Sequence, residues 1–200
     1  MVFKSVDSNA NNNLQLTIDP ADLADTRAIS SILAQSFYNL PEFAHWVYPF
    51  IQVTINEDLR YRLRSRSPLY CCLVAKLANH NQEGIANEYN SDSNLQIAGT
   101  VEIALRSASF WSNERHYPYI SNLAVNINYR RLGIGSQLLA KCEQIAADWG
   151  YQETRLHVLD SNQSAKQLYR YNGYQILQIE ASWGKFWLDY SPRLLLKKQI

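Results

Sequence analysis

Cysteine is scarce in this chain, and the few that occur are badly placed for cross-linking. Among 200 residues there are 3 cysteines: Cys71 and Cys72 are adjacent, and Cys142 falls on the apolar side of a predicted helix. An odd number excludes a complete disulfide framework, and the spacing offers no metal-ligand pattern. We therefore expect reduced packing residues and no metal, with a reactive thiol as the alternative.

The chain also lacks an excess of charge and a long apolar run. Its 19 basic and 18 acidic side chains give a net charge of +1, which argues against the strongly basic face that nucleic acid requires. No apolar run is long enough to span a bilayer, and the Asn-rich start lacks the apolar core of a signal peptide. We expect a cytoplasmic, soluble protein with neither a nucleic-acid nor a membrane partner.

Apolar periodicity is missing only at the start, so residues 1–13 are predicted to be a flexible leader. Residues 14–200 suit one domain, and 46% of the side chains are apolar, enough for a core. Strands are predicted at 14–18, 70–75, 95–105, 119–125, 154–159, 174–179 and 186–196, and helices around 23–37, 51–63, 138–149 and 165–171.

In this order, strands that pair as hairpins come first, and strands that alternate with helices follow. The pattern predicts an α/β (α+β) fold: a mixed, mostly antiparallel twisted sheet of about seven strands with helices on both faces. The polar segment 79–94 is predicted to be an extended hairpin loop. The arginines Arg60, Arg62, Arg64 and Arg66 scatter around their helix, so we interpret them as a solvated face, with recruitment of an acidic partner as the alternative.

A glycine turn joins the strand at 119–125 to the helix that follows it. Gly133 and Gly135 carry no Cβ, and Arg130 and Arg131 precede them. The first turn of a helix has unpaired amide N–H groups and the positive end of the helix dipole, so it attracts anions. The pattern predicts a phosphate site, with simple turn chemistry as the alternative. A dinucleotide-binding fingerprint would need a third glycine and a later acidic residue, which are missing.

A polar cluster at 160–162 precedes the helix that is predicted to end at Asn172 and Gly173. Asn162 and Tyr169 are seven residues apart, so both project from one side of that helix, and the small Ala165 between them leaves room for a ligand. The alternative is a capping asparagine and a half-buried aromatic ring.

These two blocks together resemble the signature motifs of the GNAT superfamily of acyl-CoA-dependent N-acyltransferases. The run Arg130-Arg131-Leu132-Gly133-Ile134-Gly135 is similar to its Arg/Gln-x-x-Gly-x-Gly/Ala signature. The run Asn162-x-x-Ala165-x-x-Leu168-Tyr169-x-x-x-Gly173-Tyr174 is similar to its second block, in the right order and at the right separation. The match covers about residues 119–179 and implies the GNAT fold, in which a parallel strand pair splays apart.

The resemblance also implies acetyl-CoA as the cosubstrate, without a metal. The pantetheine arm would pair with the backbone of 123–125, the pyrophosphate would lie on the amides of 131–136, and Asn162 would hydrogen-bond the arm near the thioester. The implied cofactor-binding residues are Leu123, Ala124, Val125, Arg130, Arg131, Leu132, Gly133, Ile134, Gly135, Ser136, Asn162 and Tyr169.

Proton transfer suggests the catalytic residues. An ordinary phenol titrates near 10 and a thiol near 8.5, so Tyr169 would protonate the leaving thiolate at a cost of about 2 kcal/mol, or donate a strong hydrogen bond to it. Similarity to protein N-terminal acetyltransferases implies that His157 is the base and Tyr119 its partner, together orienting a water. The alternatives are a core histidine, a packing tyrosine, and Glu102 as the base, although an exposed strand carboxylate is the simpler interpretation of Glu102.

The acceptor is the least constrained prediction. A protein α-amine titrates near 7.7 to 8.0 and a lysine near 10.4, a difference of roughly 3.4 kcal/mol, so lysine needs a stronger base. Resemblance to bacterial and plastid-type members implies protein α-amines as the main acceptors and lysine ε-amines as second substrates, with a peptide or protein partner and a monomer or homodimer. A small-molecule acetyltransferase and a non-catalytic acetyl-CoA-binding module are the alternatives. The insertion at 79–94 and the turn at 183–186 depart from the N-terminal subset.

Overall fold

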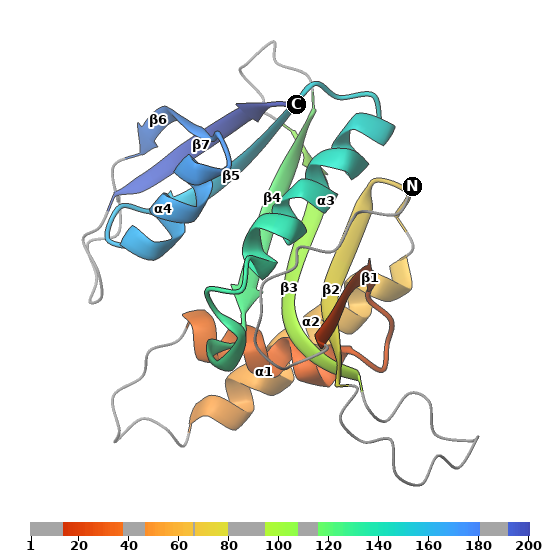
Figure 1. Cartoon of the computed structure of the whole chain (residues 1–200). Helices are drawn as coiled ribbons and strands as arrows, with labels where there is room; N and C mark the ends of the chain where they lie inside the picture. Colours follow the sequence, from red (N-terminus) through yellow and green to blue (C-terminus); the bar gives the residue numbers. More distant parts are fainter. Residues whose placement is uncertain (1–13, 38–46, 66, 80–94, 108–115, 181–191) are drawn as a thin grey trace, which may run out of the picture.

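The computed structural model describes residues 14–37, 47–65, 67–79, 95–107, 116–180 and 192–200 (Figure 1). The predicted leader at 1–13, most of the loop predicted at 79–94 and the turn at 183–186 lie outside these residues. The described elements are β1 (Leu14–Pro20), α1 (Thr26–Phe37), α2 (Tyr48–Ser65), β2 (Tyr70–Asn79), β3 (Leu95–Arg106), β4 (Tyr117–Val125), the short 3-10 helix η3 (Ile127–Tyr129), α3 (Ile134–Asp148), β5 (Glu153–Leu159), α4 (Gln163–Tyr171), β6 (Gln175–Glu180) and β7 (Arg193–Gln199).

The described strands form one seven-stranded sheet in the order β1-β2-β3-β4-β5-β7-β6. Every neighbouring pair is antiparallel except β4 and β5, which run parallel. The predicted mixed, mostly antiparallel sheet is therefore confirmed. Of the strand predicted at 186–196, the structure describes only the second half, and there β7 continues to Gln199.

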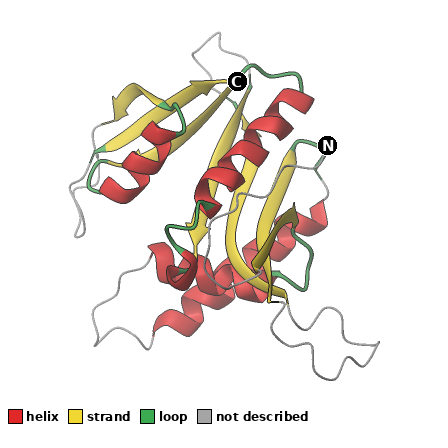
Figure 2. Cartoon of the chain, viewed as in Figure 1, coloured by secondary structure: helices red, strands yellow, loops and turns green. Residues whose placement is uncertain are grey.

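Helices cover both faces of the sheet, as predicted (Figure 2). On one face Leu73 and Leu77 of β2 join a core cluster with Leu138 of α3 and Tyr169 of α4. On the other face Val74 of β2 joins a second cluster whose members come mainly from α1 and α2. Because successive strand residues point to opposite faces, a strand covered on both sides needs apolar residues throughout. This accounts for the unbroken apolar run in β2.

Two helices end where the sequence indicated. Gly150 follows α3 with φ +85°, and Gly173 follows α4 with φ +87°. Both angles lie in the left-handed region, where a residue without a Cβ is least strained. The predicted helix ends are confirmed. None of the helices in the described ranges is both long and apolar enough to cross a membrane.

The parallel pairing between β4 and β5 is short, so the two strands separate. The strands pair only through Tyr119 with Arg155 and Ile120 with Leu156. Beyond those residues β4 and β5 diverge (Figure 1). The implied splayed strand pair is confirmed, and the diverging edges leave backbone groups of β4 unpaired on that side.

Two interpretations of charged side chains were wrong. Glu102 is not an exposed strand carboxylate, because it is only 1% exposed. Arg62 does not belong to a purely solvated face, because its guanidinium forms an ion pair with Glu102. The apolar pattern assigns each residue to one face of its own helix or strand. The pairing of Arg62 with Glu102 depends instead on how α2 lies against β3.

Candidate active site

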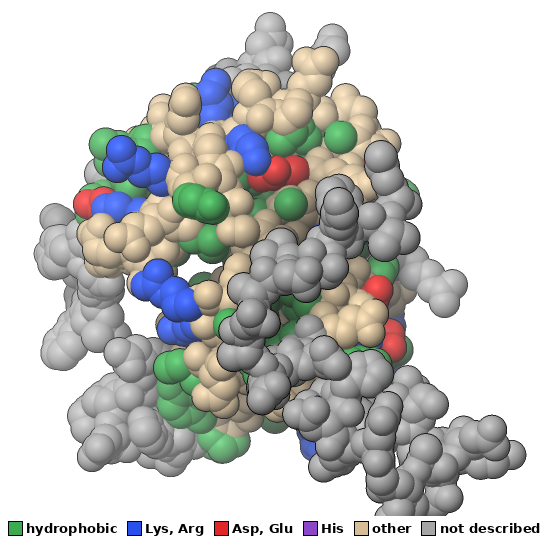
Figure 3. All heavy atoms as spheres, in the orientation of Figure 1, with side chains coloured by type: hydrophobic (Ala, Val, Ile, Leu, Met, Phe, Trp, Pro, Cys, Tyr) green, Lys and Arg blue, Asp and Glu red, His purple; other side chains and the backbone are tan. Residues whose placement is uncertain are grey.

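A cavity of about 830 Å³ opens where β4 has left β5. Its walls come from the end of β4, the turn into α3, the length of α4 and the end of α1. The lining residues from β4 and the turn are Leu123, Ala124, Val125, Tyr129, Arg130, Arg131, Gly133, Ile134, Gly135 and Ser136, and those from α4 and its cap are Asn162, Ser164, Ala165, Gln167, Leu168, Tyr169 and Tyr171. In the space-filling view the molecule is hollowed in this region, with basic side chains at the rim (Figure 3).

The predicted cofactor-binding residues are brought together, with one exception. Eleven of the twelve line the cavity, but Leu132 does not, and its side chain is 56% exposed. Leu132 lies on the turn that carries the arginines into α3. Its place in the motif sets the length of that turn, while its side chain contributes nothing to the cavity wall.

Two residues of the turn into α3 have a left-handed backbone conformation. Arg131 has φ +67° and Gly133, the N-cap, has φ +77° with no side-chain hydrogen bond to the helix. The amides of the first turn of α3 therefore have no capping side chain, which is the condition for anion binding. Arg130 folds back, and its Nε donates to the Val125 carbonyl at 3.2 Å.

Gly135 has a different role from Gly133. A Cβ on Gly135 would lie 3.1 Å from Cδ2 of Leu168, whereas a Cβ on Gly133 would meet nothing within 4 Å. The structure therefore gives a packing reason for Gly135: it lets α4 approach the first turn of α3. Close approach of a phosphate remains the prediction for the amides at this turn.

A side chain that the sequence did not single out also ties α4 to α3. Asn172 Nδ2 donates to Ser136 Oγ at 3.0 Å and to the Leu168 carbonyl at 2.8 Å. In the sequence Asn172 marked only the end of the helix. It holds the end of α4 against the first turn of α3.

Asn162 caps α4 and lines the cavity at the same time. Its Oδ1 accepts a hydrogen bond from the Ala165 amide at 3.1 Å, so the capping interpretation is correct. The cap uses the oxygen only, and the side chain borders the cavity beside Ala165. Since the Nδ2 group carries two further donors, capping and ligand binding are compatible.

Tyr169 lies on the cavity wall with only 7% of its surface exposed. Burial, with a smaller contribution from nearby Tyr119, raises the pKa of Tyr169 to about 12. The phenol therefore keeps its proton at any physiological pH. Full transfer of that proton to a thiolate of pKa near 8.5 would cost about 5 kcal/mol, more than an ordinary tyrosine would require, so a hydrogen bond without complete transfer is favoured.

Three titratable side chains form a chain of hydrogen bonds beside the strand junction. Tyr119 Oη lies 2.8 Å from His157 Nδ1, and His157 Nε2 lies 3.1 Å from Glu180 Oε1. Because a carboxylate can only accept, Nε2 donates to Glu180 and Nδ1 accepts from the Tyr119 hydroxyl. Burial raises the pKa of Tyr119, and the guanidiniums of Arg106 and Arg193 oppose part of that rise.

The structure thus brings Tyr119 and His157 into contact, as the resemblance implied, and adds Glu180. Glu180 ends an otherwise exposed edge strand, so no apolar pattern or motif marked it. It reaches His157 because β7 pairs with both β5 and β6. Neither Tyr119 nor His157 is among the residues that line the cavity, but Tyr119 is near enough to Tyr169 to help raise its pKa.

The cavity suits an extended acyl-coenzyme A. Its basic rim and the uncapped start of α3 fit a diphosphate. The edge of β4 at 123–125, which β5 does not pair, offers backbone groups to an amide-bearing arm, and Tyr169 offers a hydroxyl. Among the described residues, no group of three or more His, Cys, Asp or Glu could hold a metal ion.

Comparison with known proteins gives one match to a family model. The model described as "Acetyltransferase (GNAT) family" matches residues 40–174. That range includes β4, the turn into α3, α3, β5 and α4, and therefore both motif-bearing blocks.

Curated relatives agree with this match. GCN5-related N-acetyltransferase 10, chloroplastic, from Arabidopsis thaliana is 26% identical over 185 residues, which cover 90% of this chain and 69% of the relative. Thialysine N-epsilon-acetyltransferase from Bos taurus is 32% identical over 136 residues, which cover 68% of this chain and 74% of the relative.

A solved structure shows the same fold. PaiA N-acetyltransferase from Thermoplasma acidophilum, in complex with coenzyme A, superimposes with a TM-score of 0.62 over 93% of this chain and 99% of that one, at 18% identity. At that identity the likeness concerns the fold alone.

Proposed function

This chain belongs to the GNAT family of acetyl-CoA-dependent N-acetyltransferases, and on that premise we propose that its main acceptors are the free α-amines of peptides and proteins. Lysine ε-amines are second substrates in this proposal. The observation that carries it is the hydrogen-bonded chain Tyr119–His157–Glu180, which supplies a base beside the strand junction.

Acetyl-CoA supplies the acetyl group as a thioester. The first-turn amides of α3, with Arg131 beside them, would bind its diphosphate. The backbone of 123–125 would pair with its arm, and Asn162 would donate to it from Nδ2. With these contacts the arm would run along the cavity, with Tyr169 beside its end.

The proton of the acceptor amine leaves through Tyr119 and His157. Glu180 accepts from Nε2, which fixes the tautomer of His157 and leaves Nδ1 with a free electron pair for a proton. The Tyr119 hydroxyl, already donating to Nδ1, takes a proton from the amine or from a bridging water as it passes its own on. Burial keeps Tyr119 neutral, so the phenol relays a proton without being the final base.

This base matches α-amines better than lysines. A protein α-amine titrates near 7.7 to 8.0 and a lysine near 10.4, so whichever base accepts the proton, removing it from the lysine costs roughly 3.4 kcal/mol more. That difference would slow the turnover of lysines by several hundredfold relative to α-amines. The relay therefore favours α-amines.

A second candidate acceptor is the ε-amine of a lysine-like small molecule. One observation favours it: the bovine relative, 32% identical to this chain, is named for acetylation of the ε-amine of thialysine. The amine of such a compound must lose its proton in the same place. The two candidate acceptors therefore share the proton-transfer site and differ in the residues that would contact the rest of the acceptor.

The acceptor is tested by incubating the protein with acetyl-CoA and peptides that vary in their first two residues and carry one internal lysine. Each peptide is supplied with a free and with a blocked N-terminus, and acetylated positions are mapped by mass spectrometry. We expect α-amine acetylation of the free set, at least tenfold faster than lysine acetylation of the blocked set. Turnover of free lysine or thialysine with both peptide sets unmodified would establish the second candidate instead.

The relay is tested by the pH dependence of kcat in His157→Gln and Glu180→Gln. Without the imidazole, the rise of kcat with pH should flatten, because the group that accepts the amine proton is gone. Glu180→Gln should lower kcat by about tenfold, because the tautomer of His157 is less firmly fixed. Glu153→Gln is the matched control: it also removes a paired carboxylate, here from Arg155 at 2.6 Å, and should leave the profile unchanged. If all three variants share the wild-type profile, the base lies elsewhere.

The cytoplasm stays our proposed compartment, and a monomer or homodimer our proposed assembly. The word "chloroplastic" in the name of the Arabidopsis relative applies to that protein. Fractionation of cells that produce a tagged chain would decide the compartment.

A further inference from the structure

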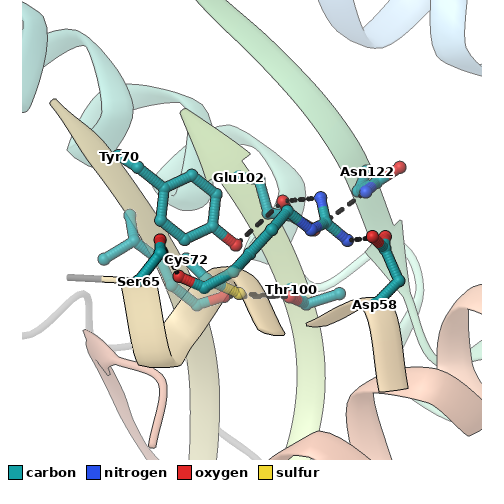
Figure 4. A network of polar contacts seen from close by, with 9 residues as sticks. Asp58, Ser65, Tyr70, Cys72, Thr100, Glu102 and Asn122 are labelled. Carbon is teal, nitrogen blue, oxygen red and sulfur yellow. Dashed lines mark hydrogen bonds and ion pairs between the residues drawn. The ribbon is translucent and has the colours of Figure 1, made fainter. Parts of the chain in front are cut away.

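A buried carboxylate on β3 is the centre of a polar cluster outside the cavity. Glu102 is 1% exposed. Its Oε1 accepts from Asn122 Nδ2 at 2.8 Å, and its Oε2 accepts from Tyr70 Oη at 3.0 Å and from the guanidinium of Arg62 (Figure 4). Arg62 is held in turn by Asp58 at 2.8 Å. Burying a charge is costly unless it is paired and hydrogen-bonded, and Glu102 meets that condition through residues from α2, β2 and β4.

One of those partners stands in an unusual backbone conformation. Asn122 has φ +53°, in the left-handed region, although it is not glycine. It belongs to a bulge: Thr100 pairs with Ala124 and Glu102 pairs with Ser121, so β4 has one residue more than β3 between these pairs. Asparagine tolerates this region better than most residues, but the conformation persists only where its surroundings fix it.

The position of the bulge connects it with the site. On one side of Asn122, Tyr119 is hydrogen-bonded to His157; on the other side, residues 123–125 line the cavity. A bulge bends its strand and changes where the following residues point. The conformation of Asn122 therefore sets the direction of the cavity wall relative to Tyr119.

Glu102 has no room to act as a base itself. Both of its oxygens are occupied by donors, and almost none of its surface is open. A base must reach the proton that it removes, directly or through one water. The alternative role considered for Glu102 in the sequence is therefore not supported.

We propose that Glu102 is a positioning residue, which holds the side chain of Asn122 and thereby fixes the left-handed bulge that aims the cavity wall at 123–125 toward the Tyr119–His157 pair. Arg62 and Tyr70 hold the carboxylate in place for this purpose. The proposal rests on the proposed function for its catalytic consequence, but the mechanical link from Glu102 to the bulge does not depend on which amine is acetylated.

A double-mutant cycle tests the link. Glu102→Gln keeps the volume and removes the charge, and Asn122→Gly removes the amide while remaining free to adopt positive φ. We expect Glu102→Gln to lower kcat by about 10- to 100-fold, since small misplacements of reacting groups have effects of this size, with the KM for acetyl-CoA changed by less than about threefold. In the Asn122→Gly background the same substitution should lower kcat by less than about threefold, because the contact through which it acts is gone. An equal effect of Glu102→Gln in both backgrounds would overturn the proposal.

Asp25→Asn is the matched control. Asp25 is also a buried, paired carboxylate, with Oδ2 3.2 Å from Lys76 Nζ, but it precedes α1 and lies outside the bulge. We expect it to lower the melting temperature and to leave kcat within about twofold. If Glu102→Gln does not fold, Asn122→Ala breaks the same contact from the other side, with the carboxylate still held by Arg62 and Tyr70, and should show the same fall in kcat.

A second measurement separates this proposal from the proposed acceptor. Amide hydrogen exchange of the peptide that spans 117–125, followed by mass spectrometry without any substrate, should be about tenfold faster in Glu102→Gln, while exchange in α3 is unchanged. Unchanged exchange in β4 would overturn the positioning role whatever the acceptor is. Failure to acetylate peptide α-amines would overturn the acceptor only, and the cycle would then be run with the amine that the wild type does acetylate.

Discussion

At the scale of single residues, Tyr169 differs from an ordinary tyrosine because the protein buries it. Its pKa of about 12 keeps the hydroxyl protonated, which makes it a dependable hydrogen-bond donor and a reluctant acid. Its sequence position indicated which residue faces the cavity. Its acidity could not be read from the sequence, because it depends on burial in the packed protein and on Tyr119 of β4, which is distant along the chain.

Tyr169→Phe should therefore lower kcat by about 10- to 100-fold, the usual contribution of one well-placed hydrogen bond in a transition state. The KM for acetyl-CoA should change by less than about threefold, because the ring and its packing remain. Initial rates over a range of acetyl-CoA concentrations measure both. Tyr61→Phe is the control, since Tyr61 of α2 is 75% exposed and does not line the cavity, and it should behave as the wild type. A wild-type kcat for Tyr169→Phe would remove the phenol from the mechanism.

At the scale of elements, the proposed anion site is the start of α3. Two glycines allow its effect on acetyl-CoA binding to be measured apart from its effect on stability. Gly133 opens α3 with φ +77° and Gly150 follows it with φ +85°, and a Cβ on either would meet nothing within 4 Å. Alanine at either position thus suffers the same backbone strain, about 1–2 kcal/mol, with no steric clash. Of these two glycines, Gly133 lines the cavity and Gly150 does not.

We expect Gly133→Ala and Gly150→Ala to lower the free energy of unfolding by similar amounts, measured by urea denaturation. Gly133→Ala alone should weaken acetyl-CoA binding, by about tenfold in calorimetric Kd, because it shifts the amides of the first turn. Equal affinity in the two variants would mean that the diphosphate does not lie on these amides.

The two glycines of the motif also show where a sequence pattern stops being informative. Both were predicted to admit a phosphate, but a methyl group on Gly135 would lie 3.1 Å from Cδ2 of Leu168 in α4, so that side chain would have to move by a few tenths of an ångström. The sequence placed the two helices correctly. Their contact was not predictable, because 32 residues separate Gly135 from Leu168 and only the packed sheet sets the distance between the helices.

At the scale of the whole molecule, several buried phenols and thiols link stability to pH. Burial raises the pKa of Tyr169 and of Cys72 to about 12, and it raises the pKa of Tyr70 and Tyr174 further. Each group is protonated in the folded protein at a pH where the unfolded chain has already lost its proton. Their contribution to stability is therefore complete below about pH 8, where the thiol of the unfolded chain also keeps its proton, and is lost as pH rises toward 12.

The free energy of unfolding should accordingly fall between pH 9 and pH 11, followed by urea denaturation at fixed ionic strength. With a folded pKa of about 12 against an ordinary value near 10, Tyr169 by itself contributes about 1 kcal/mol to the fall up to pH 11. In Tyr169→Phe the decline should be shallower by that share, whereas Tyr61→Phe, at a position 75% exposed, should leave it unchanged. A stability that stays constant up to pH 11 would show that these groups are not shielded from water.

The sequence by itself determined the order and type of the described helices and strands and the helix ends at Gly150 and Gly173, and its resemblance to the family indicated eleven of the residues that line the cavity. The elements and their ends follow from local chemistry: the period of apolar residues and the need for glycine at positive φ. The tertiary structure alone decided the burial of Glu102, its pairing with Arg62 and Asn122, and the contact of Glu180 with His157. Each of these joins side chains from different elements, and the distance between them is set by strand register and helix packing, which no local pattern encodes.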